Sequence, residues 1–327
     1  MVWFAGHMRR VLVLGGTGWL GREISRRAVE RGAEVFCLAR GRSGYVADGA
    51  HLICADRSSA GAYDEVKTDW DDVIELAYEP ALVEPALNAL AAHAAHWTLV
   101  SSVSVYSKND EPGADESARL VEPQDLSRYA DAKVAAERNS AAALGDRLLI
   151  ARPGLIVGPG DPSDRFGYWV ARLARSGPAL IPTVDRRFVQ VTDVADLASW
   201  IEQAGRERVI GAVNAVGEVH HMRDFFNAAI EATAYRGDLV ELDDQILLAQ
   251  GVNFWAGPRS LPLWLPETDT AFMQRSGAAF LAAGGTLTTL DATLARVLAD
   301  ESLRNVHRER RVGLTPTEEI TVLQAAR

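Results

Sequence analysis

The sequence predicts an α/β protein built on a doubly wound parallel sheet, with a smaller, discontinuous second lobe. Short aliphatic runs alternate with helical stretches through the first half of the 327 residues, which is the pattern of βαβ units. A glycine-rich turn joins the first run to the first helical stretch. After Arg152 the chain becomes rich in proline and glycine, which indicates that it leaves regular structure there.

The strands and helices can be placed in order along the chain. The first strand, 10–14, is apolar almost throughout, as expected of a strand that is buried on both faces. The other expected strands of the sheet are 34–38, 51–54, 72–76, 97–101 and 147–151. The helices expected between and after them are 19–31, 83–93, 126–144, 166–175 and 194–203.

The proline- and glycine-rich composition after Arg152 sets the expected domain boundaries. Residues 8–152 form the first domain, and residues 188–216 return to it, with a strand at 187–191 that rejoins the sheet. Residues 153–187 and 217–327 form the smaller lobe. Met8 directly precedes the first strand, so residues 1–7 are interpreted as an extension or a cloning remnant.

The composition narrows the function classes. Hydrophobic residues make up 48% and charged residues 24% of the chain, as in ordinary globular proteins. The net charge of −10 argues against nucleic acid and anionic membranes as partners. Cys37 and Cys54 lie in apolar runs and are expected to be buried, without the spacing of a metal site. We expect a cytoplasmic monomer or homodimer that binds a small molecule, no metal and no membrane.

A phosphate-binding loop follows the first strand. Gly15, Gly18 and Gly21 are spaced three residues apart and open the first helix. Such glycines let the backbone approach a pyrophosphate, and the helix N-terminus supplies amide donors. The order strand, turn, helix favours a Rossmann-type dinucleotide site over a merely structural glycine turn. The residues expected to contact the cofactor here are Gly15, Thr17, Gly18, Trp19, Leu20 and Gly21.

The end of the second strand indicates which cofactor binds. An acidic residue about 20 positions past the loop marks NAD, because it binds the ribose 2′-hydroxyl. Here the chain reads Arg40-Gly41-Arg42-Ser43, with no carboxylate to repel a 2′-phosphate and two arginines that can bind one. NADP(H) is therefore the expected cofactor and NAD(H) the alternative, with Arg40, Arg42 and Ser43 as contacts.

A tyrosine and a lysine form the candidate catalytic pair. Tyr129 and Lys133 are four residues apart in a predicted helix and so share one face. A nearby ammonium favours the phenolate and lowers the pKa of a tyrosine toward the range where it can exchange protons. Ser101 and Ser102 end the fifth strand, at the sheet edge where open α/β folds bind ligands.

The joint pattern resembles the extended short-chain dehydrogenases/reductases of the NAD-dependent epimerase/dehydratase group. The resemblance covers nearly the whole chain, including 72–77, 101–106, 152–160 and 188–193. It implies that Tyr129 is the acid/base, that Lys133 holds the nicotinamide ribose, and that Ser102 polarises the substrate oxygen. It further implies cofactor contacts at Asp56, near the adenine, and at Arg57, Ala77, Tyr78 and Pro153.

Three departures concern the substrate. Sugar-nucleotide members carry an asparagine three residues after the arginine of the sixth strand, where this chain has Leu155. Dehydratase members place two acidic residues after the catalytic hydroxyl, where this chain has Val103 and Ser104, so dehydratase chemistry is not expected. Arg186 matches a family arginine that grips the substrate diphosphate, and it is interpreted with Ser104 as a candidate substrate residue.

Three functions follow from these observations. The first is an NADP(H)-dependent oxidoreductase that reduces a ketone or imine of a small metabolite, or oxidises the alcohol. The second is a sugar-nucleotide epimerase with tightly bound cofactor, which Leu155 disfavours and Arg186 favours. The third is a non-catalytic dinucleotide-binding protein, which the presence of Ser102, Tyr129 and Lys133 together disfavours.

Overall fold

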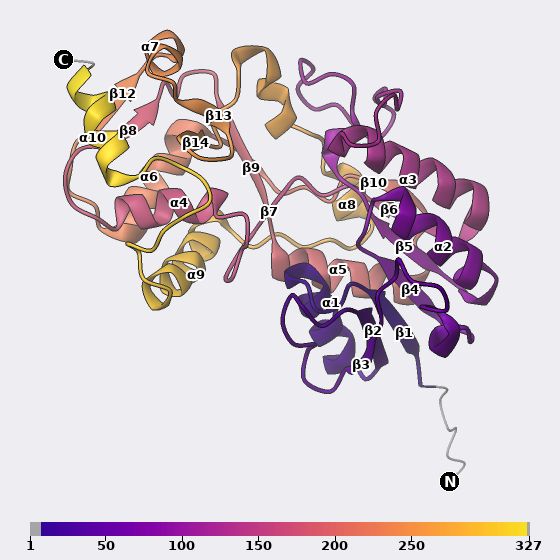
Figure 1. The fold of residues 1–327 in the computed structure, drawn as a ribbon. Coiled ribbons are helices and arrows are strands. Elements are labelled where there is room, and N and C mark those ends of the chain that lie inside the picture. Colours follow the sequence, from indigo (N-terminus) through magenta and orange to yellow (C-terminus); the bar gives the residue numbers. More distant parts are fainter. Residues whose placement is uncertain (1–7, 326–327) are drawn as a thin grey trace.

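The computed structural model describes residues 8–325 (Figure 1). A seven-stranded sheet has the order β10-β6-β5-β4-β1-β2-β3, and every neighbouring pair in it is parallel. Its strands are β1 (Arg10–Leu14), β2 (Glu34–Ala39), β3 (His51–Cys54), β4 (Asp72–Glu75), β5 (Trp97–Val100), β6 (Leu148–Ala151) and β10 (Gly211–Val213). The order reverses between β1 and β4, which confirms the doubly wound arrangement. The expected extension, 1–7, lies outside the described residues.

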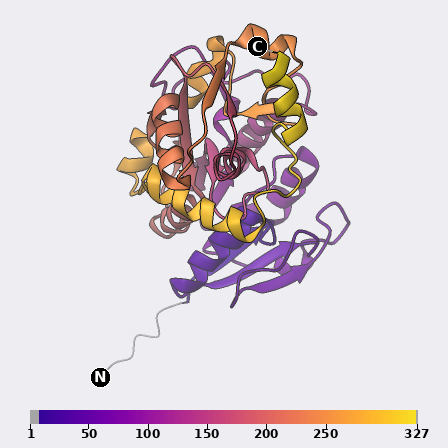
Figure 2. The ribbon, with the colours of Figure 1, turned by 90° about the vertical axis from the view of Figure 1, so that its left-hand side faces the viewer.

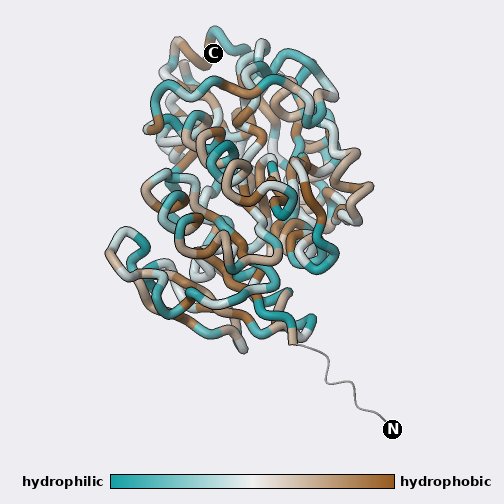
Figure 3. The backbone as a smooth tube through the Cα atoms, turned by 90° about the vertical axis from the view of Figure 1, so that its right-hand side faces the viewer, coloured by the Kyte–Doolittle hydropathy of each residue, from teal (hydrophilic) through white to brown (hydrophobic). Residues whose placement is uncertain are grey.

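Helices cover both faces of this sheet because successive side chains of a strand point to opposite sides. Val11 and Val13 of β1 pack with residues of α1 (Trp19–Glu30) and α5 (Val194–Glu207). Leu12 and Leu14 belong to a separate hydrophobic cluster, with residues of α2 (Pro80–Leu90) and α3 (Tyr129–Leu144). Figure 3 shows the hydropathy of each segment along the chain.

Two helices begin three residues away from their predicted starts. Helix α2 starts at Pro80, because a proline suits the first helical position, where no backbone N–H is needed. Helix α3 starts at Tyr129, since Asp125 accepts hydrogen bonds from the Ser127 backbone N–H at 2.9 Å and its hydroxyl at 2.7 Å. That local turn competes with helix formation at 126–128.

The smaller lobe has its own hydrophobic core, drawn from residues 155–323. Figure 2 shows its C-terminal helix α10 away from the first strands of the sheet. The strands of the lobe are β7 (Leu155–Val157), β8 (Ala179–Pro182), β9 (Phe188–Asp193), β11 (Val219–His221), β12 (Leu239–Leu242), β13 (Asn253–Trp255) and β14 (Ser260–Pro262). Its helices are α4 (Arg165–Leu173), α6 (Met222–Thr233), α7 (Asp244–Ala249), α9 (Leu290–Leu303) and α10 (Pro316–Ala325), with a 3₁₀ segment at Glu267–Met273.

The strand predicted to rejoin the main sheet does not do so. Strand β9 lies between β11 and β7 in a separate three-stranded sheet, because β10 occupies the position next to β6. Helix α8 (Ala278–Ala282) was predicted in the smaller lobe but packs on the domain that contains the seven-stranded sheet. Its Phe280 contacts Trp200 of α5, with ring centroids 5.0 Å apart. The division into two domains stays a proposal, which the separate cores support.

The two cysteines differ in burial. Cys37 in the interior strand β2 is buried, as predicted, whereas Cys54 is exposed. The prediction for Cys54 was wrong because β3 is an edge strand whose residues are mostly exposed. Neither cysteine forms a disulfide within the described part of the chain.

Candidate active site

The glycine loop has the geometry of a phosphate cradle. Gly15 has a φ of +108°, which L side chains rarely adopt. A Cβ atom on Gly21 would lie 2.5 Å from the Gly15 carbonyl oxygen, so only glycine lets α1 pack this close to the loop. No side chain caps α1 at its first residues, and the first amides of a helix have no intrahelical partner. The loop therefore fits the pyrophosphate of a dinucleotide.

Two cavities meet at this loop. The larger has a volume of about 600 Å³ and extends toward the smaller lobe, and the smaller has about 390 Å³ and lies over the ends of β2 and β3. Gly15, Gly18, Leu76 and Tyr78 line both cavities. An elongated ligand can thus run from one cavity to the other across the glycine loop.

The smaller cavity contains the residues predicted for the adenine end of a cofactor. Thr17, Arg40, Arg42, Ser43, Asp56, Ala77 and Tyr78 line it. The carboxylate of Asp56 accepts hydrogen bonds from Ser58, which, with the charges of Arg40 and Arg42, lower its pKa. Both arginines are exposed, and no side-chain hydrogen bond or ion pair with other described residues occupies them.

Arg57 lines the same cavity, but its guanidinium is engaged inside the protein. It donates to Glu75 at 2.9 Å through Nη1 and again through Nη2, and to the Tyr63 hydroxyl at 3.0 Å. The pair is buried, with side chains 8% and 0% exposed. Arg57 thus lines the cavity with its guanidinium already paired, and its contact with a cofactor stays a prediction.

The larger cavity brings Ser102, Ser104, Tyr129 and Lys133 together with Pro153 and the start of α1. Tyr129 is the first residue of α3, and 45% of it is exposed to the open cavity. The pKa of its phenol is raised overall, because partial burial outweighs hydrogen bonding to the Ser102 side chain and the charge of Arg165, which lower it. The lowering expected from Lys133 is therefore not present in this structure. Ser102 is nearly buried, and it donates a hydrogen bond to Ser104 Oγ at 3.1 Å.

Lys133 lies one turn along α3, under the two tyrosines of the cavity. Its Nζ donates to the Val100 carbonyl oxygen at 2.6 Å and lies 4.8 Å from the Tyr78 ring centroid and 5.7 Å from that of Tyr129. Burial lowers the pKa of Lys133 to about 8, although Glu75, Glu79 and Glu137 oppose the shift. A buried ammonium beside a phenol favours the phenolate.

A buried polar network behind the serines was not predicted. Glu137 lies one turn after Lys133 and accepts a hydrogen bond from Ser101 Oγ at 2.5 Å. Arg152 donates to both oxygens of Glu137, at 3.0 and 2.7 Å, and to the Tyr106 hydroxyl at 3.0 Å. The four-residue spacing from Lys133 to Glu137 was the available signal. The network fixes the end of β5, and with it Ser102.

The smaller lobe contributes a wall whose residues were not among the predicted site residues. Asp161, Ser163 and Arg165 of the segment before and at the start of α4, with Trp255 and Phe272, line the larger cavity. Arg186 lies elsewhere: its side chain is 84% exposed and its nearest carboxylate, Glu267, is 3.8 Å away. The structure does not bring Arg186 to the cavity.

The comparisons agree with this geometry. The family model described as the NAD dependent epimerase/dehydratase family matches residues 11–217. The chain belongs to this family. The match spans the glycine loop, Ser102, Ser104, Tyr129 and Lys133, as the resemblance in the sequence implied. No curated protein matches the chain.

Solved structures share the family fold at low identity. A protein from Burkholderia cenocepacia J2315, provisionally named an epimerase, has a TM-score of 0.71 at 23% identity, over 90% of this chain and 98% of its own. UDP-glucuronic acid 4-epimerase from Bacillus cereus, in complex with NAD, has a TM-score of 0.67 at 15% identity, over 90% and 99%. WbmH from Bordetella bronchiseptica, in complex with NAD⁺, has a TM-score of 0.64 at 17% identity, over 90% and 99%.

Within residues 8–325, no group of three or more histidine, cysteine, aspartate or glutamate residues is placed to hold a metal ion. In the same range, no helix has the length and apolar character needed to cross a membrane.

Proposed function

We propose that the chain is an NADP(H)-dependent oxidoreductase that reduces a ketone or imine of a small metabolite, or oxidises the corresponding alcohol. The observation that carries the proposal is the convergence of Ser102, Tyr129 and Lys133 in a cavity that continues from the glycine loop. The bound cofactor would supply hydride transfer. The chain's own residues would bind the substrate oxygen and exchange its proton.

The roles of the residues follow from their positions. The Ser102 hydroxyl, held at the end of β5, donates a hydrogen bond to the substrate oxygen beside the phenol. Tyr129 gives its phenolic proton to that oxygen as the carbonyl carbon is reduced, and takes a proton back in the reverse direction. The buried Lys133 ammonium favours the phenolate of Tyr129 and is placed to bind the cofactor ribose.

NADP(H) is preferred over NAD(H) in this proposal. Arg40, Arg42 and Ser43 line the cavity beyond the glycine loop, and guanidinium groups bind phosphate oxygens with charge-assisted hydrogen bonds. The family is described as NAD dependent, so NAD(H) stays the alternative. We also propose a cytoplasmic protein that acts as a monomer or homodimer.

A sugar-nucleotide epimerase is the second candidate, because relatives of the same fold are named as UDP-sugar epimerases. Leu155 is buried beside the cavity, where sugar-nucleotide members of the group carry an asparagine. The two functions separate in one assay. A reductase consumes NADPH when a panel of ketones and imines is supplied, whereas an epimerase converts a UDP-sugar without net change in cofactor absorbance. Epimerisation without NADPH consumption would replace our proposal by the second candidate.

A further inference from the structure

Arg165 places a positive charge inside the larger cavity. It is the first residue of α4, and among the described residues that line this cavity it is the only arginine. Arg165 and Tyr129 line the same cavity, and the charge of Arg165 acts on the phenol. Lys133, the other cation of the cavity, is already bonded to the Val100 carbonyl oxygen.

The Arg165 guanidinium forms no hydrogen bond or close ion pair with a carboxylate within residues 8–325, although the charge of Asp161 acts on it from the cavity wall. Neighbouring arginines differ: Arg304, Arg308 and Arg310 all pair with Asp164 or Glu301. The closest candidate partner in the cavity wall, Asp161, accepts from the Ser163 backbone N–H at 2.7 Å and from its hydroxyl at 2.9 Å. Arg165 is a partly buried cation whose N–H groups are left for a ligand.

The side chain is held in place by an aromatic face. The guanidinium carbon lies 4.9 Å from the centroid of the Trp255 ring, a distance typical of a cation–π contact. Trp255 itself has a φ of +67°, a left-handed conformation that bulky residues rarely adopt and that often occurs at functional sites. The contact restricts the position of the guanidinium, and its N–H groups can still donate hydrogen bonds.

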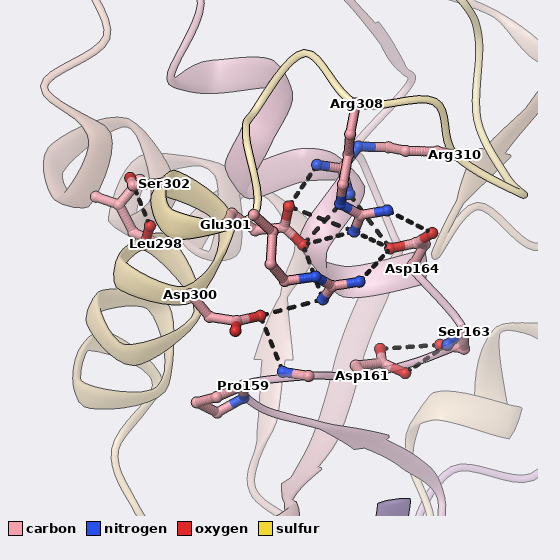
Figure 4. A network of polar contacts seen from close by, with 12 residues as sticks. Pro159, Asp161, Ser163, Asp164, Leu298, Asp300, Glu301, Ser302, Arg308 and Arg310 are labelled. Carbon is pink, nitrogen blue, oxygen red and sulfur yellow. Dashed lines mark hydrogen bonds and ion pairs between the residues drawn. The ribbon is translucent and has the colours of Figure 1, made fainter. Parts of the chain in front are cut away.

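The backbone that carries Arg165 is fixed as well. The residue before it, Asp164, has a φ of +59° and accepts from Arg308 at 3.0 Å, with further ion pairs to Arg304 and Arg310. Figure 4 shows Asp164, Arg308 and Arg310 in this network with Glu301 of α9. Because the network binds the C-terminal segment to the start of α4, Arg165 is preorganised for a ligand.

We propose that Arg165 binds an anionic oxygen group of the substrate, a carboxylate or a phosphate, while Tyr129 and Ser102 bind its carbonyl or hydroxyl oxygen. The inference deepens the proposed function and rests on it for the reacting end of the substrate. It defines the substrate class as small oxo or hydroxy compounds with an anionic group at one end. The aromatic side chains of Trp255 and Phe272 would contact the carbon chain between the two ends.

The test offers ketones in matched pairs to the protein, with NADP⁺ bound for the binding measurements and with NADPH supplied for turnover. Acetoacetate is paired with acetoacetamide, 4-oxopentanoate with its amide, and dihydroxyacetone phosphate with dihydroxyacetone. Binding is measured by calorimetry and turnover by NADPH absorbance. At least one anionic member should bind about 10- to 100-fold more tightly than its neutral partner, the effect of a charge-assisted hydrogen bond. The pair that shows it decides between carboxylate and phosphate.

Variants of Arg165 test whether this residue causes the preference for the anionic ketone. Arg165→Gln should abolish the difference within that pair, and Arg165→Lys should restore part of it. NADP⁺ affinity should stay unchanged in both, which shows that the fold and the glycine loop are intact. Arg223→Gln is the matched control, since Arg223 is exposed and pairs with Asp185 outside both cavities. It should behave as the wild type.

Two results overturn the inference: no anionic member binds more tightly than its neutral partner, or the preference survives in Arg165→Gln. Failure of the proposed function has a different signature. In that case anions bind in an Arg165-dependent manner, but no ketone consumes NADPH, or Tyr129→Phe consumes NADPH as fast as the wild type. The two proposals can therefore fail separately.

Discussion

The ring of Tyr129 lies edge-on against the ring of Tyr78, with centroids 4.9 Å apart and an interplanar angle of 77°. Tyr78 follows β4 and Tyr129 opens α3, so the contact joins two elements at the carboxyl edge of the sheet. Lys133 lies beneath both rings. The contact limits the positions that the Tyr129 phenol can take, and the first two predictions concern this group of side chains.

Removing the phenol oxygen should stop proton transfer without loosening the cofactor. Tyr129→Phe should lower turnover by about 10²–10⁴-fold, the usual contribution of a positioned general acid or base. NADP⁺ affinity, measured by fluorescence titration, should stay nearly constant because the glycine loop and arginines are unchanged. Lys133→Met should weaken both properties. Near-normal turnover in Tyr129→Phe would mean that another residue supplies the proton.

The buried lysine should make stability depend on pH. The pKa of Lys133 is about 8 in the folded protein and 10.5 in its ordinary state, so below pH 8 the folded protein bears the full cost of a buried charge. Between about pH 8 and 10.5 the unfolded chain binds more protons, and stability must rise with pH. Relative to Lys133→Met, the wild type should gain up to about 3 kcal/mol of unfolding free energy across this range.

Urea unfolding of the cofactor-free protein at several pH values measures this difference, and using the variant as reference cancels the other titrating groups. A wild-type stability that stays parallel to that of Lys133→Met from pH 7 to 10 would show that Lys133 keeps its ordinary pKa.

Cofactor preference should depend on Arg40. Calorimetry should show tighter binding of NADPH than of NADH, and Arg40→Ala should reduce NADPH affinity by about tenfold through loss of a charge-assisted bond in an exposed setting. NADH affinity should change little, because NADH lacks the 2′-phosphate. If NADH binds as tightly as NADPH in both proteins, the assignment of NADP(H) is wrong.

Sugar nucleotides should bind weakly. Leu155 offers no amide at the position where sugar-nucleotide members contact the diphosphate, and Arg186 is outside the larger cavity. A thermal-shift screen of UDP- and dTDP-sugars with bound cofactor should show no saturable shift. A strong shift with any of them would favour the epimerase over the oxidoreductase.

Glu137 should be needed for stability. Its variant Glu137→Ala leaves the Arg152 guanidinium buried without its counter-charge, which costs about 3–5 kcal/mol in comparable sites. The double variant Glu137→Ala/Arg152→Met should be less destabilised than the sum of the single variants Glu137→Ala and Arg152→Met, because the residues interact directly. Chemical unfolding monitored by tryptophan fluorescence measures all four proteins, and simple additivity would contradict the coupling.

The sequence was most informative where local pattern alone decides the structure. The apolar run 10–14 predicted β1, because few other structures bury every residue of a short segment. The glycine loop predicted the start of α1, because few sequences allow so tight a turn. The partners of Arg57 and Arg186 could not be predicted. The sequence around an arginine does not show whether its guanidinium binds a ligand, pairs with a buried carboxylate such as Glu75, or faces solvent. Arg165 was missed for the converse reason, since its place in the cavity depends on a network from residues over 130 positions away.

The chain crosses between the two cores repeatedly. It leaves the large sheet after β6, returns for α5 and β10, leaves again, and returns once more for α8 before α9 and α10 complete the smaller lobe. No single cut therefore releases the lobe that carries Arg165 and Trp255. A new substrate specificity cannot be acquired by replacing the lobe with that of another protein as one continuous segment of sequence. It must arise by changing residues in place, in the wall segments 161–165 and 254–273, while the shared framework stays intact.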